Sequence, residues 1–166
     1  MLRLRIATIL AVSSAICAAA PAHAGDSESA TASLRVYEQI QFAILLEMDF
    51  GTVVSNPAGG IVHLDTSDNS RDCGGGSLTC TGTFNFARLQ LSGSDANVRV
   101  TYDPSLQLNG PGTPILVEPE FVGGQGAVVQ LTGGSAEFEF GAKLHVNPGQ
   151  APGTYSGNFS VDVSYE

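Results

Sequence analysis

The sequence is short of positive charge, with 7 Lys and Arg residues against 16 Asp and Glu residues. Two of the basic residues, Arg3 and Arg5, stand at the very start, so the chain that follows them carries a net charge of −11. Nucleic acids and anionic membrane surfaces both require basic patches on a protein partner. The composition therefore argues against both kinds of partner.

Motifs of common catalytic chemistry are also missing. No serine stands in a G-x-S-x-G turn, and "GGQG" at Gly123–Gly126 has neither the Lys-Ser/Thr pair nor the helix that would bind phosphate. His63 and His145 alternate with apolar neighbours and are interpreted as ordinary outward-facing strand residues. Glu118 and Glu120 could act as an acid–base pair, but nothing in the sequence directs them at a substrate. We expect a protein that is not an enzyme and has no cofactor.

Long apolar runs are absent except near the N-terminus. There a positively charged start is followed by "IATILAVSSAICAAA" and by the small-x-small sequence Ala22-His23-Ala24, the pattern of a secretory signal. The apolar run is too short for a comfortable membrane span. We expect residues 1–24 to be a signal peptide cleaved between Ala24 and Gly25, which leaves an exported chain of 142 residues without a membrane span.

Cysteine is scarce as well. Cys17 would leave with the signal peptide, and only Cys73 and Cys80 remain. In an oxidising compartment this closely spaced pair predicts a disulfide, and two thiols without further ligands make a poor zinc site. By the loop-entropy estimate so small a ring contributes roughly 2–3 kcal/mol. The disulfide should therefore hold a loop rather than the whole fold.

What the sequence does contain is alternation of apolar and polar residues, punctuated by Gly, Pro, Asn and Asp. The pattern predicts nine strands and no convincing helix after the signal. About nine strands in 142 residues favour two antiparallel sheets packed face to face, so we expect an all-β sandwich over residues 34–166 behind a flexible arm, residues 25–33. The predicted strands are 34–46, 48–54, 60–66, 83–91, 97–102, 114–117, 128–132, 136–146 and 155–165.

The two C-terminal segments alternate most regularly. From Tyr155 onward every odd-numbered residue except Gly157 is apolar or aromatic, and the even-numbered ones are polar. "NPGQAPG" separates this segment from strand 136–146, so the two are expected to pair as one long hairpin. In "TFNFARLQLSG" the alternation changes phase between Phe86 and Leu89, which suggests a bulge.

One acidic loop is a candidate cation site. Asp65, Asp68 and Asp72, with Asn69, offer hard oxygen ligands of the kind that calcium prefers. The loop lacks the alternating acids, central Gly and final Glu of a helical calcium loop. A solvated turn rich in Asx residues is the simpler interpretation, and calcium is the alternative.

Several short stretches together resemble a known family. They are "MDFGTVV", "GGIVHLD", "FARLQLSG", "EFGAKLHV" and "APGTYSGNFSVDVSY". They resemble an exported proteobacterial family catalogued as domain of unknown function 4402, which is similar to spore-coat protein U-like and fimbrial subunit domains. The resemblance runs from about Leu34 to the end, and its most specific parts are the Asp49-Phe50-Gly51 turn and the closing G-x-Y-x-G-x-F-x-V-x-V-x-Y.

The ending also resembles that of pilins assembled by the chaperone–usher route, because Gly153 is fourteenth from the C-terminus and Tyr165 is penultimate. The resemblance implies an immunoglobulin-like, pilin-like sandwich that lacks its last strand. The C-terminal strand would then border the open groove that the missing strand leaves. A strand from another chain would fill it by β-augmentation. The assembly strand implied by the resemblance comprises Gly153, Tyr155, Phe159, Val161, Val163 and Tyr165.

The functional hypothesis is therefore a structural subunit of a surface fimbria or coat. Its expected partners are a periplasmic chaperone, an outer-membrane usher and other copies or related subunits, and its expected destination is the cell surface by way of the periplasm. The donor strand would come from the N-terminal arm, reaching to about residue 38. Whether Leu34 and Val36 belong to that arm or to the first strand of the domain stays open, and so does completion of the sandwich by the chain itself. The alternatives are a self-contained secreted domain binding calcium or carbohydrate and, third, a hydrolase.

Overall fold

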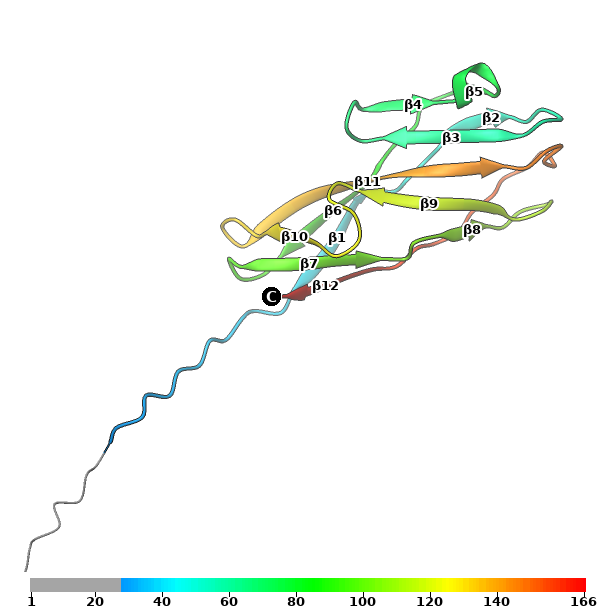
Figure 1. The fold of residues 1–166 in the computed structure, drawn as a ribbon. Coiled ribbons are helices and arrows are strands. Elements are labelled where there is room, and N and C mark those ends of the chain that lie inside the picture. The colour runs from blue at the N-terminus through cyan, green and yellow to red at the C-terminus, as the bar shows by residue number, and fades with distance from the viewer. Residues whose placement is uncertain (1–27) are drawn as a thin grey trace, which may run out of the picture. The chain divides into compact units, whose positions relative to one another are not determined.

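In a computed structural model, residues 28–166 are described, and the chain divides into two units, residues 1–35 and 36–166. Residues 28–35 contain neither helix nor strand. The second unit is all-β (Figure 1), and the predicted fold class is confirmed. Its strands are β1 (Gln41–Leu46), β2 (Thr52–Val54), β3 (Gly60–Asp65), β4 (Ser70–Asp72), β5 (Thr79–Thr81), β6 (Ala87–Ser92), β7 (Asn97–Tyr102), β8 (Leu106–Leu108), β9 (Ile115–Phe121), β10 (Ala127–Gln130), β11 (Ser135–Val146) and β12 (Val161–Tyr165).

The long strand β11 organises the larger sheet. Phe140 pairs with Ala87 of β6 and with Phe121 of β9, so β6 and β9 lie on opposite edges of β11. Beyond Phe140, β3 continues along the edge that β6 leaves. The sheet order is therefore β1-β6-β11-β3-β4, with β9 against the other edge of β11 and β8 against β9 (Figure 1).

A second sheet has the order β10-β7-β12, and β2 pairs with β5 in a small third one. All of these pairings are antiparallel. β6 and β7 are consecutive strands in different sheets, joined by a short turn through Gly93 and Ser94. The chain thus passes from one layer to the other at this turn, as a sandwich requires.

Buried apolar side chains form two clusters, and β11 contributes to both. We call the first the disulfide-side core; it consists of Phe50, Val62, Leu64, Leu78, Phe86, Ile115, Val117, Ala142, Leu144 and Val146. We call the second the tail-side core; it consists of Ala87, Leu89, Leu91, Val98, Val100, Leu131, Phe138 and Phe140. The alternation of β6, β7 and β11 places these residues on the inner faces.

The expected C-terminal hairpin is wrong. β11 pairs with β6, β3 and β9, whereas β12 pairs with β7 in the other sheet. Both edges of β11 are occupied over Phe140–His145, so the final strand has no place beside that part of it. The strand itself is shorter than predicted, because residues 155–160 are not part of it. The first strand likewise begins at Gln41 rather than Leu34.

The phase change near Phe86 is a transition between the two cores. Phe86 and Ala87 are consecutive buried residues, and Phe86 belongs to the disulfide-side core while Ala87 belongs to the tail-side core. The irregularity in strand pairing lies elsewhere, in β1, where the register shifts between Ile44 and Leu46. The predicted bulge within β6 is therefore wrong in position. β1 carries the additional residue.

Candidate functional site

The edge of β12 that faces away from β7 is open. Asp103 N–H donates to Ser160 O and Glu166 N–H donates to Asn97 O, both at 3.1 Å. Alternate residues of an antiparallel strand direct their backbone groups to opposite sides, so the even-numbered residues face β7. In residues 28–166, β7 is the only strand that pairs with β12. The residues whose N–H and C=O groups point to the open side are Val161, Val163 and Tyr165.

The side chains of the same residues, and of Phe159, pack against the tail-side core and are partly buried. The Phe159 ring meets Phe140 edge-on, with centroids 5.5 Å apart. The predicted separation of the tail into an apolar inner face and a polar outer face is confirmed in the burial of these residues. β12 therefore combines an apolar inner face with an unpaired backbone edge.

β1 is a second open edge over the same core. Phe42 lies opposite Leu91 and Ile44 opposite Leu89, so these pairs share a face of the sheet. Leu91 and Leu89 are buried, yet Phe42 is 44% exposed and Ile44 is 69% exposed. The core-facing side of β1 is therefore uncovered, and all six residues of the strand are exposed.

The two edges lie on the same side of the sandwich. Tyr165, at the end of β12, donates a hydrogen bond from its hydroxyl to Glu38 O at 2.8 Å, three residues before β1 begins. Ile40 packs against the tail-side core. We call β1 and β12, with their open edges, the seam.

Not all of the expected assembly strand lies at the seam. Tyr155 packs against the disulfide-side core, and its hydroxyl donates to Ala151 O and accepts from Gln150 Nε2, both at 2.8 Å. Gly153 precedes this corner with φ of +148°, close to Pro111. Gly153 and Tyr155 thus shape the crossing between β11 and β12. Val161, Val163 and Tyr165 remain as seam residues, and Phe159 packs against the same core just before β12.

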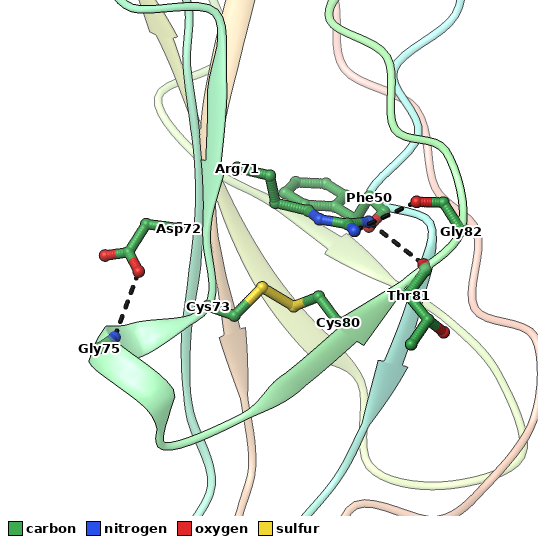
Figure 2. The surroundings of a disulfide bond; sticks show 8 residues. All are labelled: Phe50, Arg71, Asp72, Cys73, Gly75, Cys80, Thr81 and Gly82. Atoms are coloured by element: carbon green, nitrogen blue, oxygen red, sulfur yellow. Dashed lines mark hydrogen bonds between the residues drawn. A yellow bond between two sulfur atoms is a disulfide. The ribbon is translucent and has the colours of Figure 1, made fainter.

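The Asp49-Phe50-Gly51 turn supports the disulfide region shown in Figure 2. Asp49 Oδ1 accepts the Gly51 N–H at 2.8 Å, and Gly51 has φ of +71°, which favours glycine. The turn presents Phe50 O to Arg71 Nη1 at 2.8 Å. A Cβ on Gly51 would lie 2.4 Å from that nitrogen, so glycine is needed for the approach as well.

Arg71 and the disulfide hold the small β2–β5 sheet to β3 and β4. The guanidinium also donates to Thr81 O and Gly82 O, at 3.4 and 3.2 Å (Figure 2), and lies over the Phe84 ring. Cys73 and Cys80 form the predicted disulfide, with Cα atoms 6.2 Å apart. No pattern in the sequence indicated that Arg71 has this structural role.

The calcium candidates do not converge. Asp65 Oδ1 accepts hydrogen bonds from the N–H and hydroxyl of Ser67, which lower the pKa of Asp65 below its ordinary value of 3.8. Asp72 instead accepts from Gly75 N–H at 3.2 Å. Asp68 lies in the turn between β3 and β4. Across residues 28–166, no three His, Cys, Asp or Glu side chains form a group that could hold a metal ion.

Ion pairs join the outer faces of β3, β11 and β9. His63 Nε2 lies 2.7 Å from Glu120 Oε2, and His145 Nε2 lies 2.8 Å from Glu118 Oε2. Lys143 also pairs with Glu120. Sequence reasoning predicted the outward orientation of the histidines but not these partners, because the pairing of β11 with β9 was not predicted. A shallow cavity of about 220 Å³ lies beside Glu120 and Lys143.

This ion-pair network predicts weakened stability in acid. Burial alone would raise the pKa of Glu120, but hydrogen bonds from Lys143 and His63 outweigh it and hold the pKa below 4.5. A lowered folded-state pKa stabilises the protein above the unfolded value, and this contribution is lost as pH falls through the folded value. Glu120→Gln should therefore reduce the loss of stability below pH 4.5, by less than about 1 kcal/mol because the pair is well solvated.

The measurement is urea unfolding across the acid range, with Glu137→Gln as the control because Glu137 is an exposed β11 carboxylate without a described ion pair. Equal acid sensitivity of Glu120→Gln and the parent would contradict the expectation.

At alkaline pH the relevant group is Lys143. The hydrogen bond to Glu120 raises the pKa of Lys143 above 10.5. That contribution is present below pH 10.5 and is lost as pH rises through the folded-state value.

The signal-peptide prediction, with its cleavage between Ala24 and Gly25, lies outside the described residues. Residues 28–166 include no helix of sufficient length and apolarity to cross a membrane.

Among known proteins, a family model described as Domain of unknown function (DUF4402) matches residues 40–165. No curated protein and no solved structure matches the chain. The match covers most of the chain and all of the strands described above, so the chain belongs to the DUF4402 family.

Proposed function

We propose that this domain is a structural, non-catalytic subunit of a surface fimbria or coat, and that each copy accepts a strand donated by its neighbour. The observation that carries the proposal is the seam, where apolar side chains and unpaired backbone groups occur on both β1 and β12. Open edges of this kind invite pairing with another chain. An added strand would satisfy the outward backbone groups of β12 and cover Phe42 and Ile44.

The N-terminal arm has the chemistry of a donor. Apolar residues alternate at Ala30, Ala32, Leu34 and Val36, and none of them belongs to a strand. Leu34 is 87% exposed and Val36 is 79% exposed. Since β1 begins only at Gln41, both side chains are available to a neighbour. Each would contribute about 1.5–3 kcal/mol on full burial.

The length of the arm is also adequate. Residues 28–36, when extended at about 3.3 Å per residue, span roughly 30 Å, whereas the five residues of β12 span about 17 Å. One arm can therefore cover β12 and extend beyond it. In this proposal the chain is exported, a periplasmic chaperone covers the seam before assembly, and an usher exchanges the chaperone for the arm of the next copy.

A peptide of residues 29–38 should cap the seam and stop assembly of the full chain. At about 100 times its Kd, it would stabilise the domain by about 2.7 kcal/mol, which corresponds to a rise in Tm of roughly 5–10 °C. Size-exclusion chromatography with light scattering and a thermal melt measure the two effects. The matched control is the same peptide carrying Leu34→Ser and Val36→Ser. A stable monomer that ignores both peptides would refute the donor-strand proposal.

A further inference from the structure

Tyr165 closes a ring of hydrogen bonds at one end of the seam. Its hydroxyl accepts from Ser94 N–H and donates to Glu38 O, both at 2.8 Å. Glu38 N–H in turn donates to Ser94 Oγ at 2.8 Å. Both backbone polar groups of Glu38 are therefore tied, one to the β6–β7 turn and one to the last residue of β12.

Two further features support this ring of hydrogen bonds. Tyr37 stacks on Tyr165, with centroids 4.6 Å apart and planes inclined by 23°. Gly93 lets the hydroxyl approach the turn, because a Cβ at that position would lie 2.3 Å from it. We call Tyr37, Glu38, Ser94 and Tyr165 the tyrosine clamp.

Strand directions show what the clamp restrains. Tyr165 pairs with Val98 and Gln41 pairs with Ser92, so β12 ends and β1 begins at the β6–β7 turn. An arm inserted into its own seam would have to run toward this turn and then reverse within residues 37–40 to enter β1. The clamp occupies Tyr37 and Glu38 at the point where that reversal would start.

We propose that the tyrosine clamp prevents a chain from completing its own seam and so reserves the seam for the arm of a second copy. This inference rests on the proposed function. The clamp restrains Tyr37 and Glu38 by three contacts, and an arm returning into its own seam would have to break or rearrange them. The arm of another copy enters without moving these residues. Tyr165 therefore acts as a positioning residue that favours assembly between copies.

Crosslinking tests the clamp with two new cysteines on exposed outer positions, Ser33→Cys in the arm and Asp162→Cys on β12. The full chain is exported to an oxidising periplasm, so that Cys73 and Cys80 stay paired, and is then treated with a short bifunctional maleimide. Denaturing gels separate crosslinked dimers and longer ladders from internally crosslinked monomers. Mixing the two single-cysteine variants shows directly whether an arm reaches a second copy.

The parent should give mainly crosslinks between copies. Tyr165→Phe removes both hydroxyl bonds but keeps the ring, and should raise the share of internal crosslinks about fivefold or more, as expected for loss of two hydrogen bonds. Ser94→Ala removes only the bond from Glu38 and should act in the same direction, more weakly, even if Tyr165→Phe folds poorly. Tyr102→Phe is the control, since its described hydrogen bonds use only the backbone.

An unchanged ratio in Tyr165→Phe and Ser94→Ala, with crosslinks mainly between copies in the parent, would overturn the clamp while leaving donation of the arm between copies intact. Mainly internal crosslinks in the parent, or the absence of crosslinks of both kinds, would instead refute the proposed function. The two failures are thereby distinguished.

Discussion

Val161→Pro is expected to abolish assembly while leaving the domain folded. Val161 is the first residue of β12, and its N–H points to the open side of the strand. Proline is tolerated at such a position because no bond to β7 is lost. Its ring would obstruct the incoming strand, and a carbonyl of that strand would lose the Val161 N–H as its hydrogen-bond donor. Light scattering should show a monomer, and circular dichroism should show the sheet signal of the parent.

Asp162→Pro is the matched control. The side chain of Asp162 is exposed, but its N–H faces β7, so proline there breaks the ladder inside the domain. We expect this variant to be destabilised by about 3 kcal/mol or more. A folded, fully assembling Val161→Pro would show that the open edge of β12 is not the joint.

Phe140→Ala should be the most damaging single truncation in the tail-side core. Phe140 is 0% exposed, and its ring lies within 6 Å of Tyr102, Phe121, Phe138 and Phe159. Removing a buried phenylalanine costs about 3–5 kcal/mol, a large part of the 5–15 kcal/mol that holds a typical domain together. Denaturant unfolding measures the loss.

Phe42→Ala is the comparison for this truncation, because Phe42 is an aromatic residue of the same region that is only half covered. Its loss should affect the free energy of unfolding much less, and should weaken assembly, since the donated strand would cover it. Equal destabilisation by the two substitutions would mean that the core side of β1 is covered in solution.

The sequence predicted which side chains of a strand lie on its inner face, but not which strands pair with each other. The alternation in β11 and in the tail correctly separates Phe138, Phe140 and Val163 from the polar residues between them, because a strand has a period of two whatever it pairs with. Partner choice depends on long-range contacts. "NPGQAPG" suggested a hairpin, yet β6, β3 and β9 occupy β11 and the tail crosses to β7.

The same distinction between local pattern and long-range pairing explains which residues of the candidate site were predicted and which were not. Phe159, Val161, Val163 and Tyr165 were identified because the tail itself carries the pattern. The exposed face of β1 was not identified, since Phe42 and Ile44 are apolar residues of the kind found in buried strands. No local pattern records that β6 is the only strand of residues 28–166 that pairs with β1. The ion pairs of Glu118 and Glu120 and the contacts of Arg71 join residues at least ten positions apart, which no local pattern records.

The clamp also determines how mechanical tension would travel through a chain of such domains. A pull on the arm enters the folded part at Tyr37 and reaches the end of β12 through one aromatic ring and one hydroxyl. That load path is short and bypasses Cys73, Cys80 and Arg71. We therefore expect the half of the domain closed by the disulfide to carry less of the load, and rupture to begin by sliding of β12 along β7.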